Sequence, residues 1–380
     1  MTTFHPYDAL RLKRGGTALK HPKSMFLAAL TGIVLLAAGC GSSPSQATTP
    51  NTSSQSVTTL NETGSTLLYP LFNIWAKAYH RTHPDIKIST GDTGSGTGIA
   101  SAVAGTVEIG ASDAYMTTAQ IKQATGTILN IPLAISAQVI AYNVPGLSKQ
   151  LVLSGPVIAG IYSGTITNWN DPKIRALNPG VTLPDLAITP IHRSDGSGDS
   201  FIFTQYLSYS TPSWMKSVGF STSPNFPAVK RAVGAEGTSG ELSALAATKG
   251  GITYAGTSYL SEIKSNHLAY ALLVNKAGNA VDATLPHIEA AAAAKVPDTP
   301  TDERISLIFA PGANAYPIIN YEYAVVKADQ PSAATASALR AFLKWIITSG
   351  NSSTYLNQVG FMPLPSSVVA KSQAQIDKIK

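Results

Sequence analysis

Small polar residues and glycines recur in loops that each come directly before an expected helix. Their hydroxyl groups and the backbone amides freed by glycine belong to Ser65, Thr66, Ser95, Ser197, Gly64, Gly94, Gly96, Gly196 and Gly198. Helix N-termini present unpaired N–H groups and a partial positive charge, which favour an oxyanion. Arg193 adds a planar guanidinium suited to two oxygens of a phosphate or sulfate. These residue types therefore predict an anion site built mainly from neutral dipoles.

The elements that must position these loops are strands followed by glycine-rich turns and helices. Apolar alternation predicts strands over residues 57–62, 85–90, 107–112, 186–192 and 316–326. Apolar stripes predict helices after the loops at 63–66 and 91–98, and over 199–207 and 334–349. This order indicates an α/β fold with mostly parallel sheets. In such sheets ligands bind beyond the carboxyl ends of the strands, where the polar loops are expected.

Each of these features has a plainer explanation when it is taken alone. A Gly/Ser loop before a helix is usually a turn with an N-cap, and the glycines of residues 94–98 do not form the dinucleotide-binding pattern. Arg193 alone is equally consistent with a surface ion pair. His192 is expected to be structural, since neighbouring side chains on a strand point to opposite faces. The anion site therefore depends on several segments converging.

The polar loops also carry motifs of a known family. Thr63-Gly-Ser-Thr, Gly94-Ser-Gly, Gly110-Ala-Ser-Asp113 and His192-Arg-Ser-Asp-Gly-Ser-Gly-Asp-Ser-Phe201 closely resemble the Pst-type periplasmic phosphate-binding proteins. The likeness runs in order from about Leu60 to Pro365 and includes Thr165-x-x-x-Trp169-Asn-Asp171. The resemblance implies a type II periplasmic-binding-protein fold, with two lobes, a ligand cleft and two hinge crossings. It also implies high-affinity capture of inorganic phosphate for the membrane subunits of an ABC import transporter.

The same resemblance implies a set of phosphate ligands. They are Thr66, Leu67 (backbone), Ser95, Asp113, Arg193, Ser197, Gly198 (backbone) and Asp199. Asp113 is the expected discriminator, because an ionised carboxylate accepts a proton from phosphate but opposes the lone pairs of fully deprotonated sulfate. No cofactor and no metal are implied.

Asp199 departs from the best-known form of the family, which has a threonine donor at this position. An ionised Asp199 in the site would require a second proton on the ligand, or a neighbour that neutralises it. The alternative is an N-cap aspartate that is turned away from the ligand.

The first residues read as a targeting segment. Five cationic side chains precede an apolar run over 25–38, which is too short for a membrane span and suits a signal peptide. Leu35-Leu36-Ala37-Ala38-Gly39-Cys40 resembles the lipobox of bacterial lipoproteins, although Ala37 stands where a leucine is usual. Cys40, the only cysteine, is the expected lipidation site. The alternative is simple cleavage that yields a freely soluble product.

Composition divides the rest of the chain and excludes one class of partner. We expect a signal peptide over 1–39, a flexible tether over 40–57, lobe I over 58–134 plus 316–380, and lobe II over 135–315. Residues 1–39 hold five of the 27 Lys and Arg residues and one of the 21 Asp and Glu residues, so the remainder has a net charge of +2. Nucleic-acid binding therefore loses its main support.

Other functions fit the residues less well. A phosphohydrolase would need Ser197 as nucleophile, but no base is identifiable for it. A calcium site over 195–199 lacks the ligand count of an EF-hand loop. Sulfate or molybdate is the rival ligand for a binding protein, and a secondary adhesive role stays open. The predicted location is the extracytoplasmic face of the cell membrane, through a lipid anchor.

Overall fold

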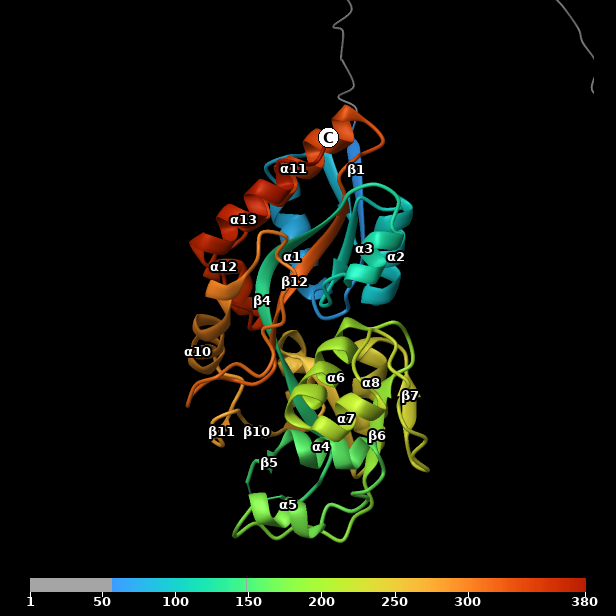
Figure 1. Ribbon diagram of the computed structural model, residues 1–380, viewed down its shortest axis with the longest axis vertical. Coiled ribbons are helices and arrows are strands. Elements are labelled where there is room, and N and C mark those ends of the chain that lie inside the picture. Colours follow the sequence, from blue (N-terminus) through green and yellow to red (C-terminus); the bar gives the residue numbers. More distant parts are fainter. Residues whose placement is uncertain (1–56, 148) are drawn as a thin grey trace, which may run out of the picture. The chain divides into compact units, whose positions relative to one another are not determined.

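A computed structural model describes residues 57–147 and 149–380 (Figure 1). Cys40, the signal segment and nearly all of the tether lie outside the described residues. Within the described part of the chain, no helix is both long enough and apolar enough to cross a membrane.

Strands form the frame of the molecule. They are β1 (Thr58–Gly64), β2 (Ile86–Ser89), β3 (Ile109–Ser112), β4 (Ile128–Tyr142), β5 (Val152–Leu153), β6 (Thr189–Arg193), β7 (Val233–Ala235), β8 (Gly251–Gly256), β9 (Ala269–Tyr270), β10 (Leu272–Val274), β11 (Ala280–Val281) and β12 (Ile319–Lys327). Over the described residues, one sheet has the order β2-β1-β3-β12-β4-β8-β6-β7, with β9 also paired to β4, and a smaller sheet has the order β11-β10-β5.

Helices cover the strands and fill the connections between them. The α-helices are α1 (Tyr69–His80), α2 (Ser95–Ala104), α3 (Thr118–Gln123), α4 (Gly155–Tyr162), α5 (Pro172–Leu177), α6 (Gly198–Ser210), α7 (Pro212–Ser217), α8 (Gly237–Ala247), α9 (Leu260–Ser265), α10 (Leu285–Lys295), α11 (Ala333–Ile347), α12 (Ser353–Leu356) and α13 (Ser366–Ile376). Short 3-10 helices are η1 (Thr257–Tyr259), η2 (Val296–Asp298) and η3 (Asn357–Val359). Figure 1 shows α1, α2 and α11 around β1, and α4, α6 and α8 near β6.

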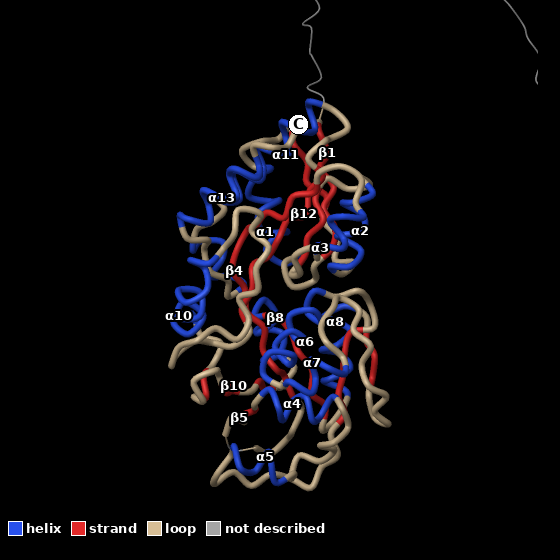
Figure 2. The backbone as a smooth tube through the Cα atoms, in the orientation of Figure 1, coloured by secondary structure: helices blue, strands red, loops and turns tan. Residues whose placement is uncertain are grey.

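The two-lobe fold is visible in how the main sheet is paired. β1 pairs in parallel with β2 and β3, and β6 pairs in parallel with β7 and β8. β4 joins these two groups, because nine of its first ten residues pair with β12 and its last five with β8 (Figure 2). The expectation of mostly parallel sheets is therefore wrong for β4 and β12, which run antiparallel to their neighbours. β4 takes the chain from the first group of strands to the second, and β12 returns along it, so the two run in opposite directions.

The burial of apolar side chains explains why β4, α1 and α11 form where they do. All fifteen residues of β4 are buried, as expected for a strand between two others. α1 carries Pro70 in its first turn, where a missing N–H is tolerated, and buries Phe72, Trp75 and Tyr79. α11 buries Leu339 and Phe342 against the same face, and the Trp75 indole donates to the Gly350 carbonyl at 2.9 Å. The helices expected from the apolar stripes at these positions are confirmed.

Gly64 ends β1 at the point where the chain turns toward α1. Its φ of +141° lies in the region that favours glycine, and a Cβ at this position would overlap the Ala111 carbonyl of β3. Gly180 has a φ of +76°, and a Cβ added there would have no atom other than those of its chain neighbours within 4 Å. It therefore provides a matched comparison for Gly64.

We expect Gly180→Ala to lower the free energy of unfolding by about 1 kcal/mol, the strain of a left-handed residue. Gly64→Ala should lower it by at least about 2 kcal/mol more, because β1 must also separate from β3. Denaturant unfolding of the two variants measures both values. Equal losses would contradict the close packing of β1 on β3.

Candidate functional site

Arg193 ends β6 and lies almost wholly out of solvent. Its side chain is 1% exposed. Nε and Nη2 donate to the two carboxylate oxygens of Asp195 at 2.7 and 2.5 Å. Nη1 donates to Thr66 Oγ1 at 3.0 Å and to Asp199 Oδ2 at 3.2 Å. The interpretation of Arg193 as a surface ion-pair residue is therefore wrong, since a buried guanidinium with paired carboxylates keeps its charge in the interior.

Asp113 follows the last residue of β3 and is also buried. Ser65 Oγ donates to Asp113 Oδ1, and Ser95 Oγ donates to Oδ2 at 3.2 Å. Ser65 lies in the turn before α1, and Ser95 is the first residue of α2; both follow strands that are neighbours in the sheet. Burial raises the pKa of the Asp113 carboxyl, while its hydrogen bonds and the charge of Arg193 act in the opposite direction.

The loop before α6 meets the residues around Asp113. The Gly96 N–H donates to the Gly196 carbonyl at 2.7 Å. A Cβ on Gly198 would overlap Asp113 Oδ2 and Ser95 Oγ, so only glycine permits this approach. Arg193 and Thr66 are joined in the same region. The structure therefore brings together the polar loops that follow β1, β2, β3 and β6, as the predicted anion site requires.

Two serine hydroxyls at this junction accept hydrogen bonds from backbone N–H groups near helix starts. Ser65 Oγ accepts from the Leu68 N–H at 2.9 Å, and Ser197 Oγ accepts from the Ser200 N–H at 3.2 Å. Ser197 therefore serves as the N-cap of α6, as the plainer explanation of such loops supposes. Ser95 and Gly198 are the first residues of α2 and α6, so their N–H groups have no helical acceptor.

Thr66 and Leu67 lie in the turn between β1 and α1. Thr66 Oγ1 is 2.7 Å from Thr238 Oγ1, and its carbonyl accepts from the Tyr259 hydroxyl at 2.8 Å. Leu67 is fully buried, and its carbonyl accepts from Ser258 Oγ at 2.8 Å. The side chain of Leu67 packs against Gly256 of β8, and an aliphatic side chain offers an anion no hydrogen bond, so only its backbone can serve as a donor.

Asp199 points into the junction and is fully buried. Its Oδ1 accepts from Gln138 Nε2 at 2.9 Å, and its Oδ2 accepts from Arg193 Nη1 and from Thr238 Oγ1 at 3.3 Å. The alternative of an N-cap aspartate turned away from the site is therefore wrong. Burial, followed by the charge of Asp113, raises the pKa of Asp199 to about 7.

Two neighbours of Asp199 were not predicted from the sequence. Thr238 follows Gly237 at the start of α8, directly after β7, so the strand, glycine and hydroxyl pattern of the other loops could have revealed it. Gln138 lies within the buried strand β4, and only its polarity in an apolar run distinguishes it. Its Oε1 has no hydrogen-bond partner in the described structure.

The charge balance of this junction is negative. Asp113, Asp195 and Asp199 surround one guanidinium, and Glu241 lies close enough to act on it. Burial raises the pKa of Glu241 well above its ordinary value. Since isolated buried charges are strongly unfavourable, protons must be held on some of these carboxyls.

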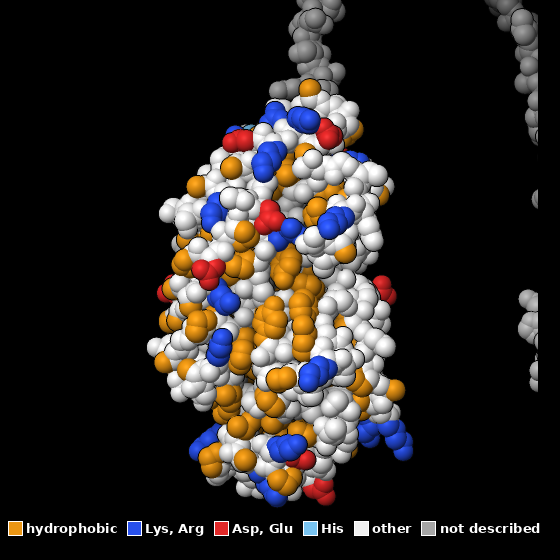
Figure 3. All heavy atoms as spheres, in the orientation of Figure 1, with side chains coloured by type: hydrophobic (Ala, Val, Ile, Leu, Met, Phe, Trp, Pro, Cys, Tyr) orange, Lys and Arg blue, Asp and Glu red, His pale blue; other side chains and the backbone are white. Residues whose placement is uncertain are grey.

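The acidic residues of the calcium alternative are already paired with an arginine. Asp195 and Asp199 are occupied by the Arg193 guanidinium, which already supplies their cation. Across residues 57–147 and 149–380, no group of three or more His, Cys, Asp or Glu side chains is placed to hold a metal ion. On the face drawn in Figure 3, Lys and Arg side chains lie scattered among acidic and uncharged ones.

His192 stacks on Phe226 with ring centroids 4.5 Å apart, which is a structural role.

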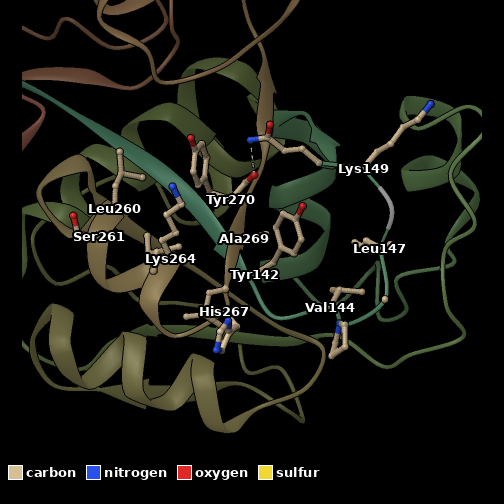
Figure 4. Close-up of a pocket in the computed structure, with 15 residues that line it drawn as sticks. Tyr142, Val144, Leu147, Lys149, Leu260, Ser261, Lys264, His267, Ala269 and Tyr270 are labelled. Carbon is tan, nitrogen blue, oxygen red and sulfur yellow. Dashed lines mark hydrogen bonds between the residues drawn. The ribbon is translucent and has the colours of Figure 1, made fainter.

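A separate cavity of about 810 Å³ lies away from these loops (Figure 4). Its lining includes Tyr142, Leu260, Lys264, His267 and Tyr270, and none of the predicted phosphate ligands. In one wall of this cavity, Gln150 Nε2 donates to the Tyr270 carbonyl at 2.8 Å. The cavity has no buried cation such as Arg193, so the junction of polar loops is the better anion site.

Comparison with known proteins agrees with this geometry. The profile of the PBP superfamily domain matches residues 49–349. The phosphate-binding protein PstS of Xylella fastidiosa strain 9a5c is 32% identical over 329 residues, which cover 86% of this chain and 87% of the relative. PstS of Methanocaldococcus jannaschii is 32% identical over 380 residues, which cover 93% and 96% of the two chains.

Solved structures match the fold as well. A high-affinity periplasmic phosphate-binding protein, PfluDING, solved with bound phosphate, has a TM-score of 0.67 and 20% identity, covering 83% of this chain and 93% of that one. A phosphate-binding protein of Stenotrophomonas maltophilia has a TM-score of 0.62 and 19% identity, with 84% and 94% covered. With its superfamily match and its full-length relatives, the chain belongs to the PstS family of phosphate-binding proteins.

Proposed function

We propose that this protein binds inorganic phosphate outside the cytoplasmic membrane and delivers it to an ABC import transporter. One observation supports this most strongly: Arg193 reaches Thr66, while Gly198 lies against Asp113 and Ser95, so donors and an acceptor from four loops meet. The relatives are named as binding proteins, which agrees with a carrier rather than an enzyme.

The proposed ligands are those expected from the family motifs. Arg193 supplies a guanidinium, and the hydroxyls of Thr66 and Ser197 donate to the anion, whereas the hydroxyl of Ser95 donates to Asp113. The N–H group of Gly198 is a further donor at a helix start, and that of Leu67 is a donor in the turn before α1. These ligands are Thr66, Leu67, Ser95, Asp113, Arg193, Ser197, Gly198 and Asp199.

Asp113 gives the site its preference for a protonated anion. Its two oxygens accept from serines, and an ionised carboxylate can accept one more hydrogen bond only from a ligand that carries a proton. Phosphate carries that proton at neutral pH, whereas sulfate does not. Asp199 adds a second carboxylate, so the complete site holds more negative charge than Arg193 can balance.

Calorimetric titration tests the role of Asp113. Wild type should bind phosphate and reject sulfate by a factor of about 10⁴ or more. Asp113→Asn, whose amide can donate toward sulfate, should reduce this ratio at least tenfold. Asp92→Asn removes an exposed charge from the neighbouring loop and should leave the ratio unchanged. Sulfate binding as strong as phosphate binding in wild type would contradict the proposal.

The pKa of Asp199 predicts proton uptake on binding. At pH 8, a carboxyl with a pKa of about 7 is mostly ionised, and the arriving anion raises that pKa further. Wild type should therefore take up about one more proton per phosphate than Asp199→Thr, and its affinity should fall more steeply as pH rises above 7. Titration in buffers of different ionisation enthalpy measures the uptake, with Asp92→Thr as the control. Identical uptake in wild type and Asp199→Thr would remove Asp199 from the mechanism.

We further propose that Cys40 is lipidated and holds the protein at the membrane surface through the 40–57 tether. The support is the lipobox-like run before Cys40 and the absence of another cysteine. Several acyl chains provide firm attachment, since each buried methylene contributes about 0.8 kcal/mol.

Fractionation of expressing cells tests this anchor. Wild type should be found with the membranes and should incorporate labelled fatty acid, whereas Cys40→Ser should be recovered in the soluble extracytoplasmic fraction. Phosphate affinity should be equal in the two forms. A wild type that is soluble and unlabelled would instead support simple cleavage.

A further inference from the structure

Glu322 carries a buried carboxyl group that is not among the proposed phosphate ligands. It lies in β12 and is 0% exposed. Its Oε1 accepts from Ser136 Oγ at 2.5 Å and from Asn320 Nδ2 at 3.2 Å. Its Oε2 is buried and accepts no hydrogen bond from any described residue. An ionised glutamate with one oxygen unpaired would be strongly unfavourable at this depth.

The position of Glu322 follows from an irregularity between β4 and β12. Glu322 pairs with Ala134, but the next residue, Tyr323, pairs with Pro132, so Leu133 is an extra residue in β4. Proline has no N–H to give to the ladder, and a bulge accommodates it. Bulges bend a strand and redirect side chains. This one lies beside the end of β3, because Tyr323 also pairs with Ser112.

The carboxyl of Glu322 is therefore adjacent to that of Asp113. Asn320 Nδ2 donates both to the Asp113 carbonyl, at 3.1 Å, and to Glu322 Oε1. The antiparallel register that pairs Tyr323 with Ser112 also sets Glu322 opposite Asp113, and each carboxyl acts on the pKa of the other. Two ionised carboxylates offer only acceptors to each other, so this contact is favourable only when one of them carries a proton.

We propose that Glu322 is a positioning residue that remains protonated and donates from Oε2 to Asp113. Asp113 is thereby kept ionised, with its free acceptor lone pair directed at the proton of the ligand. This inference rests on the proposed phosphate site and adds to it the group that maintains its discriminating carboxylate.

The surroundings decide which of the two carboxyls holds the proton. Asp113 has donors from Ser65 and Ser95 and feels the charge of Arg193, all of which favour its ionised form. Glu322 has only neutral partners, Ser136 and Asn320, and the nearby charges that act on it are the carboxylates Asp113 and Asp199. In agreement, burial and then the charge of Asp113 raise the pKa of Glu322 well above its ordinary value.

Two substitutions of Glu322 distinguish a role as a hydrogen-bond donor from a role as a negative charge. Glu322→Gln keeps the shape, accepts from Ser136 through Oε1 and donates to Asp113 through Nε2. Glu322→Met has a similar volume but cannot donate. If Glu322 is protonated, glutamine replaces it without a change of charge, whereas methionine leaves Asp113 without its partner and raises its pKa.

The experiment combines calorimetric titration of the full-length protein with infrared spectroscopy. The ratio of phosphate to sulfate affinity should stay within about threefold of wild type in Glu322→Gln and fall at least about tenfold in Glu322→Met. The infrared difference between ligand-free wild type and Glu322→Gln should contain the C=O band of a protonated carboxyl throughout the neutral pH range. This band is independent of phosphate, so it tests Glu322 even if phosphate fails to bind.

Two results would overturn the inference. One is an infrared difference that shows an ionised carboxylate, which would mean that Glu322 holds no proton. The other is an equal loss of selectivity in the glutamine and methionine variants, which would mean that the donated hydrogen bond has no role. Phosphate failing to bind to wild type while the protonated band is present would contradict the proposed function and leave the proton assignment of Glu322 supported.

Discussion

The buried guanidinium of Arg193 is the interaction on which the rest of the site depends. In place of water, the charge has two carboxylates from just after it in the chain, Asp195 and Asp199, and the hydroxyl of Thr66, which lies 127 residues away. Asp195 fixes the plane of the guanidinium by a two-point contact. Nη1 is then directed at Thr66 and Asp199, so the fold of both lobes and the geometry of the anion site share one constraint.

An excess of carboxyls around one cation has a physical consequence for the ligand. A site with this many acidic groups must gain or share protons before it accepts a further anion. Selectivity for a protonated oxyanion and coupling to pH then have the same origin. Hydroxyls and helix N-termini supply donors without adding charge, which lets a protein bind an anion in a site whose own balance is negative.

Much of the fold and of the anion site could be predicted from the sequence, because the patterns that indicate strands, loops and helix starts are local. Strand, glycine-rich loop and helix recur with the right periods, and the loops before α1, α2 and α6 are confirmed as helix starts. Gln138 and Glu322 could not be predicted in the same way, since their roles depend on which strands become neighbours. The antiparallel pairing of β4 with β12, and the bulge opposite Glu322 and Tyr323, are long-range features that no short motif encodes.

The central claim is that Arg193 and Asp113 hold the same tetrahedral anion. A crystal structure of the protein with phosphate, at a resolution that shows hydrogen atoms, tests it most directly. The account predicts a phosphate with oxygens about 3 Å from an Arg193 nitrogen and from an Asp113 oxygen, and a proton between the phosphate and that carboxylate. A phosphate bound elsewhere, or one that touches Arg193 while Asp113 contacts only protein, would contradict it.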